Sequence, residues 1–101
     1  MISIDFSRAY RQADSMAQCA EEMLQQHKKM AGVIEEIRGA WQGETASSYI
    51  KKIEGFSSQL KANSEKCRKD AAAFRARIDA IKEAEEEAAA AIAASAAASG
   101  E

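Results

Sequence analysis

The side chains able to take part in covalent or metal chemistry are few and widely spaced. The chain has 101 residues with two cysteines, Cys19 and Cys67, and a single histidine, His27. A protein metal site needs three or four ligands, and the neighbours of His27 are glutamine and lysine. We therefore predict no metal site and no cofactor.

The acidic residues do not form a catalytic pair. Glu21 and Glu22 are adjacent, as are Glu35 and Glu36, and adjacent residues on a helix point in different directions. The sequence also has no Gly-rich phosphate loop, no Cys-x-x-Cys and no His-Glu-x-x-His. We expect a protein that is not an enzyme.

The composition indicates an all-α protein. The chain has no proline, few aromatic residues and a formal net charge of −2, and its abundant Ala, Glu, Lys, Arg, Gln and Met favour helices. No apolar stretch approaches the roughly 18 residues of a membrane span. The segment from Met1 to Phe6 lacks the basic and apolar parts of a cleavable signal peptide. These features alone are typical of a cytosolic protein.

A first helix is predicted from about residue 4 to 40. Its apolar or small residues recur in steps of three and four, as a heptad seam does. A parallel row widens the apolar face beyond a two-stranded seam. Ser3 or Asp5 can cap the start. The seam is Phe6, Ala9, Ala13, Met16, Ala20, Met23, His27, Met30, Ile34, Ile37 and Trp41, and the second row is Tyr10, Ala17, Leu24 and Ala31.

His27 interrupts this seam with a polar ring. Buried polar seam residues help to set the register between helices, and we interpret His27 and Asn63 in this way. A pH-sensing role for His27 is the alternative, because its environment moves the pKa of histidine across the physiological range.

Trp41-Gln42-Gly43 lies where the helical period stops and restarts, so we predict a turn at 41–43. Gly43 can adopt the positive φ of a tight reversal. A second helix is predicted from about 44 to 93, with a one-residue slip near Cys67. Residues 94–101 are predicted to be a flexible Ala-rich tail. The second seam is Ala46, Tyr49, Ile53, Phe56, Leu60, Asn63, Cys67, Ala71, Phe74, Ile78, Ile81 and Ala88.

An antiparallel hairpin about Gly43 places Cys19 and Cys67 at the same level. They could form a disulfide, worth about 3–4 kcal/mol. Packed helix axes lie roughly 8–10 Å apart, which often leaves Cα atoms too distant. Free cysteines that fill the core are the favoured interpretation.

Two helices cannot cover all of this apolar surface, and residues 1–93 are too short for a third long helix. We therefore predict self-association, or a partner hairpin, that completes a four-helix bundle. The basic stretch from Lys61 to Lys82 lacks interleaved aromatic residues, so we expect no nucleic-acid binding. The predicted hairpin and dimer core is Phe6, Met16, Met23, Met30, Ile34, Ile37, Ile53, Phe56, Leu60 and Phe74.

A chain of about one hundred residues with a central Trp41-x-Gly43 between long amphipathic helices resembles the WXG family, the early-secreted-antigen-target-like small proteins of type VII secretion. The resemblance implies a helical hairpin that pairs antiparallel with itself or a related hairpin. It also implies export by a membrane machine driven by an ATPase, without signal cleavage. Trp41 and Gly43 would then form part of a secretion-linked surface. The tail after Ile81 is the next candidate for such a surface.

One element of that family is missing. Many members carry a C-terminal aromatic-x-x-x-acid signal, but here Phe74 is followed four residues later by Ile78. The single match, Tyr10-x-x-x-Asp14, lies in the first helix. The export signal is therefore degenerate or supplied by a partner, and two roles remain open. The chain is a secreted dimeric substrate or component, or an adaptor that binds the N-terminal helical domain of a larger toxin.

Overall fold

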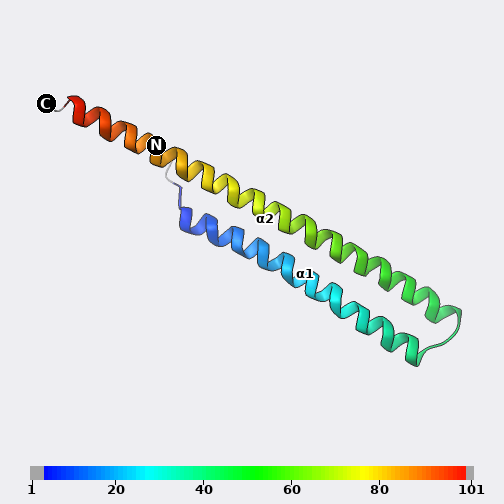
Figure 1. The fold of residues 1–101 in the computed structure, drawn as a ribbon. Coiled ribbons are helices and arrows are strands. Elements are labelled where there is room, and N and C mark those ends of the chain that lie inside the picture. Colours follow the sequence, from blue (N-terminus) through cyan, green and yellow to red (C-terminus); the bar gives the residue numbers. More distant parts are fainter. Residues whose placement is uncertain (1–3, 100–101) are drawn as a thin grey trace.

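The computed structural model describes residues 4–99 and forms a long helical hairpin. Helix α1 spans Phe6–Ala40 and helix α2 spans Glu44–Ser99. The two helices run antiparallel in a rod of 88 × 16 × 15 Å (Figure 1). The described residues contain no strand, which confirms the predicted all-α hairpin.

The ends of α1 are set by local hydrogen bonds. The side chain of Asp5 accepts a 3.0 Å hydrogen bond from the Arg8 N–H and caps the helix. The alternative cap, Ser3, lies outside the described residues. At the other end, Trp41 adopts an extended conformation while its N–H still donates to the Ile37 carbonyl at 2.8 Å. The chain then reverses at Gly43, whose φ is +103°.

Helix α2 continues beyond the level at which α1 begins, so its last turns project from the hairpin (Figure 1). The prediction of a flexible segment from residue 94 is wrong as far as Ser99, because α2 is helical to that residue. The cause is local, since alanine has the highest helix propensity and needs no packing partner. Gly100 and Glu101 lie outside the described residues.

One regular row of small or compact side chains lies deepest between the helices, and we call it the closed row. Its two most deeply buried members are alanines of α1, with Ala13 2% and Ala20 3% exposed. Small side chains at a helix contact allow the two axes to approach closely. The closed row consists of Ala13, Ala20, His27 and Ile34 on α1, and Ile50, Ser57, Ser64, Ala71 and Ile78 on α2.

Two serines complete the closed row on α2. The Ser64 hydroxyl donates a 2.7 Å hydrogen bond to the Ala20 carbonyl, and Ser57 Oγ lies 2.8 Å from His27 Nδ1. These partners allow hydroxyl groups to be buried.

The predicted α2 seam is wrong at Tyr49, which is exposed. The predicted slip near Cys67 is absent because the row keeps its heptad spacing throughout.

Ile81 and Ala88 of the predicted α2 seam are exposed too, and the same correction applies to two residues within the length of the hairpin. Asn63 is exposed, and Phe56 is 53% exposed, so neither belongs to the core of the hairpin. Each immediately precedes a buried serine and points away from α1. A place for Phe56 in the core of a dimer stays a prediction.

Most other predicted core residues form a second row that is only half-buried. Each lies three positions after a closed-row residue, and Ile34 alone among the predicted set is buried in the closed row. Phe6, near the start of α1, is also half-buried. This half-buried row is Met16, Met23, Met30 and Ile37 on α1, and Ile53, Leu60, Cys67 and Phe74 on α2.

The closed row predicts a sharp contrast between two neighbouring alanines. Ala71→Leu should lower the free energy of unfolding by about 1–3 kcal/mol, because the added atoms have no space between the helices. Ala72→Leu is the matched control, since Ala72 is exposed and should tolerate leucine. Urea unfolding followed by circular dichroism at one protein concentration measures both, and equal effects would contradict the closed row.

Candidate functional site: a protein-binding surface

One long side of the hairpin is apolar and unfilled. Viewed along a helix axis, the residue three positions after a closed-row residue is rotated from it by about 60°. The residue immediately before a closed-row residue is rotated by about 100° in the same direction. The half-buried row and the residues that precede the closed row therefore share one side. At the turn end these preceding residues are apolar, namely Val33, Tyr49 and Phe56, all exposed. We call the half-buried row together with these three residues the open face.

The turn presents an aromatic pair to solvent. The rings of Trp41 and Tyr49 lie 5.8 Å apart between centroids at 49°, a geometry that aromatic pairs favour. They are 52% and 51% exposed. Nearby, Arg38 forms a 3.1 Å ion pair with Glu54 that ties the helices together. The aromatic pair thus projects from the end of the hairpin at which the Arg38–Glu54 ion pair connects the two helices.

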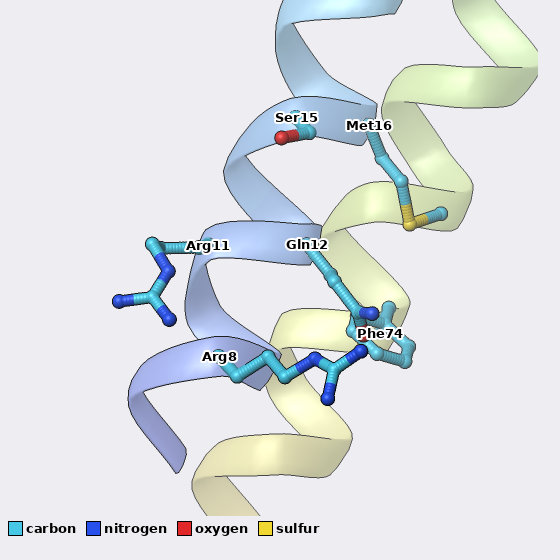
Figure 2. A pocket seen from close by; sticks show the side chains of 6 residues that line it. All are labelled: Arg8, Arg11, Gln12, Ser15, Met16 and Phe74. Carbon is cyan, nitrogen blue, oxygen red and sulfur yellow. The ribbon is translucent and has the colours of Figure 1, made fainter. Parts of the chain in front are cut away.

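The opposite end of the open face holds a groove of about 730 Å³. Met16 and Phe74 line it from the two helices, and Figure 2 shows Met16 on the α2 side of α1, Arg8 extending toward Phe74 and Arg11 projecting away from α2. Gln12 and Ser15 complete the lining. An apolar floor with a cationic rim suits an apolar or aromatic side chain beside an acidic group.

The opposite side of the hairpin is closed by polar contacts. The Tyr10 hydroxyl donates to Asp79, Arg75 stacks over the Tyr10 ring at 4.8 Å, and Arg75 also pairs with Asp14 at 2.9 Å. The hydrogen bond to Asp79 is the main reason why the pKa of Tyr10 is raised above its ordinary value. Both members of the Tyr10-x-x-x-Asp14 match are therefore engaged with α2.

The two thiols are free, with Cys19 exposed and Cys67 half-buried. Cys67 belongs to the half-buried row, whereas Cys19 precedes Ala20 of the closed row and points to solvent. The interpretation of Cys19 as a core-filling residue is therefore wrong, and the disulfide considered from the sequence is not formed in this structure.

His27 lies at the contact between the helices, as its seam position predicts. Its Nδ1 atom is 2.9 Å from the Ser57 carbonyl, which can only accept, so the tautomer with hydrogen on Nδ1 makes this bond. Across residues 4–99, no group of three metal-ligating side chains gathers around His27 or elsewhere. Within the same residues, neither helix has an apolar stretch long enough to span a bilayer.

Sequence reasoning placed Trp41 and Gly43 in the turn but missed the exposed positions of Tyr49 and Val33. A strict heptad counted back from Ile78 through Ala71 would have placed Ile50, not Tyr49, between the helices. This heptad count was the sequence signal that could have identified the exposed residues of the open face on α2.

Comparison with known proteins gives one match. The model of the WXG100 family, described as proteins of 100 residues with WXG, matches residues 1–62. The matched segment covers α1, the Trp41-x-Gly43 turn and the first part of α2. Searches of curated proteins and of solved structures find no match.

Replacement by alanine should change the stability of the hairpin in opposite directions at Gly43 and at Gly39. Gly43→Ala should destabilise the hairpin by roughly 1–2 kcal/mol, because its positive φ is strained for any L-residue. Gly39→Ala should stabilise it by about 0.5–1 kcal/mol, because Gly39 is helical and nothing blocks a methyl group there. Thermal unfolding by circular dichroism compares them, and changes of the same sign would contradict this turn geometry.

Tyr10 predicts a loss of stability at alkaline pH. A raised pKa in the folded state stabilises the hairpin fully below the ordinary tyrosine pKa of about 10, and this contribution is lost as the pH rises through the folded-state value. Asp79→Ala should lower the pKa of Tyr10, measured by ultraviolet titration of the phenolate. Glu65→Ala, another exposed acid on α2, is the control, and indistinguishable titrations of both variants would rule out the Asp79 contact.

Proposed function

The chain belongs to the WXG100 family, whose members are small helical proteins associated with type VII secretion, and from this premise we propose that it is exported by a type VII system as a dimer. It acts through protein–protein contacts as a secreted substrate or component. It leaves the cytoplasm without cleavage of a signal peptide.

The open face supports the dimer. The chain exposes 7842 Å², whereas a compact protein of 10.9 kDa exposes about 5,600 Å². Met23, Met30 and Leu60 remain only half-buried in the single hairpin. A second hairpin laid on this side would bury them and give a four-helix bundle.

The aromatic pair at the turn supports a role in recognition by the secretion machinery. Trp41 and Tyr49 are half exposed although large aromatic side chains gain most from burial. Exposed aromatic residues on a rigid element are frequent anchors of protein interfaces. We propose that this pair, held in place by Gly43, contacts the membrane ATPase or its associated components. The projecting part of α2 after Ile81 is the next candidate.

A second role is favoured by the absence of the C-terminal aromatic-x-x-x-acid signal. Phe74 is half-buried and is followed by the buried Ile78 rather than by an acid. The chain would then be an adaptor whose open face binds the N-terminal helical domain of a larger type VII toxin, which carries the signal. The native mass of the purified chain separates the roles, because a stable dimer alone argues against an obligate adaptor.

The export proposal predicts that Trp41→Ala lowers secretion at least severalfold while the hairpin stays folded, because about half of the Trp41 surface is exposed to solvent. The measurement is the ratio of secreted to cellular protein in a host with an active type VII system. Ile4→Ala, which removes another exposed large side chain at the end of the hairpin far from the turn, is the matched control. Unchanged secretion of Trp41→Ala, or no secretion of the wild type, would reject the proposal.

A further inference from the structure

The two ends of the hairpin differ in how their helices are built. We call residues 28–56 the turn half. Residues 6–26 of α1 and 58–78 of α2 form the base half, and the hydrogen-bonded pair of His27 and Ser57 lies between the two halves. We propose that the turn half opens reversibly as one unit while the base half stays paired. This conformational device needs no particular partner and goes beyond the proposed function.

Every glycine within the two described helices lies in the turn half. These glycines are Gly32 and Gly39 on α1 and Gly55 on α2. Glycine weakens a helix interior relative to alanine, because its backbone loses more conformational freedom on folding. The base half contains no glycine. Its helices are therefore intrinsically more stable than those of the turn half.

Packing does not require these glycines. Each lies five positions after a closed-row residue, which places it about 140° from that row, on the outer side of its helix. A Cβ atom added at Gly32 or Gly55 would meet no atom within 4 Å. The same outer position in the base half holds Ala62 and Ala76 on α2. Glycine thus lowers the stability of the turn half without allowing any closer approach of the helices.

Much of the apolar surface of the turn half does not contribute to packing between the helices. Val33, Tyr49 and Phe56 each leave 40% or more of their surface exposed. The closed row is also less deeply buried here, with Ile34 and Ile50 8% and 9% exposed against at most 5% in the base half. Because burial of apolar surface is the main source of stability, the turn half gains less from folding.

Side-chain contacts between the helices hold the base half more firmly. The buried hydroxyl group of Ser64 donates to a carbonyl of α1 at 2.7 Å, and Arg75 stacks over the ring of Tyr10. In the turn half, Arg38 pairs with Glu54, but both side chains are about half exposed. Exposed ion pairs contribute little to stability.

These differences predict which part of the hairpin opens first. A segment with few buried contacts and low helix stability can open as a separate cooperative unit. The base half can stay paired around an opened turn half, because the entropy of loop closure rises only slowly with loop length. The aromatic pair of Trp41 and Tyr49 lies in the turn half. A partner that binds this pair only in the folded turn half would therefore shift the opening equilibrium.

Native-state hydrogen exchange of the full chain, followed by mass spectrometry, tests the order of opening. At one protein concentration, and after correction for intrinsic rates, amides of the turn half should exchange at least about tenfold faster than amides of the base half. Equal protection of the two halves would contradict separate opening.

Two substitutions at the same outer helix position distinguish separate from global opening. Ala62→Gly should lower the protection of the base half about fivefold and leave the turn half unchanged, because residue 62 stays helical when the turn half opens. Gly32→Ala should raise the protection of both halves about fivefold, because the base half opens only after the turn half. Gly55→Ala repeats this test from α2.

Other patterns of protection would overturn the proposal. If both substitutions change both halves equally, the hairpin opens only globally. If Gly32→Ala affects the turn half alone while Ala62→Gly lowers both halves, the base half opens first. None of these measurements involves secretion, so failure of this proposal and failure of the proposed function are distinguished.

Discussion

Close approach of the two helices along the closed row is the constraint on which the rest of the structure depends. Alanine and serine side chains hold five of its nine positions, with Ala13, Ala20 and Ala71 at most 5% exposed. Because the axes approach closely there, larger side chains such as Met23 and Leu60 lie beside the contact rather than within it. The packing that holds the hairpin together therefore also creates its apolar open face.

The heptad period made the two-helix architecture predictable. It did not predict which side chains of α2 pack between the helices. Steps of three and four predicted two helices, and Trp41-Gln42-Gly43 predicted where the chain reverses. On α2, the choice between Phe56 and Ser57 could not be made from hydrophobicity. Serine is buried there because a histidine on the other helix supplies a hydrogen-bond partner. That partner lies thirty positions away in the sequence.

The candidate site was predictable at the turn and not along the open face. Trp41 and Gly43 are adjacent to the break in periodicity, so local sequence identifies them. The exposure of Tyr49 depends on how α2 is rotated about its axis, which the row of small residues determines. The end of α2 contrasts with Tyr49, because local sequence rather than packing determines its structure. Beyond residue 93, the helix propensity of alanine extends α2 without contacts to α1.

The distribution of apolar area links folding to partner binding. The closed row buries alanine, serine and isoleucine side chains, whereas Met23, Leu60 and Phe74 are only half-buried in the single hairpin. In the proposed dimer, the free energy of pairing would add to the stability of the fold, which would then depend on protein concentration. Substitutions on the open face affect folding and association together. Trp41, which is exposed at the turn and lies outside the open face, is the position where recognition separates most cleanly from stability.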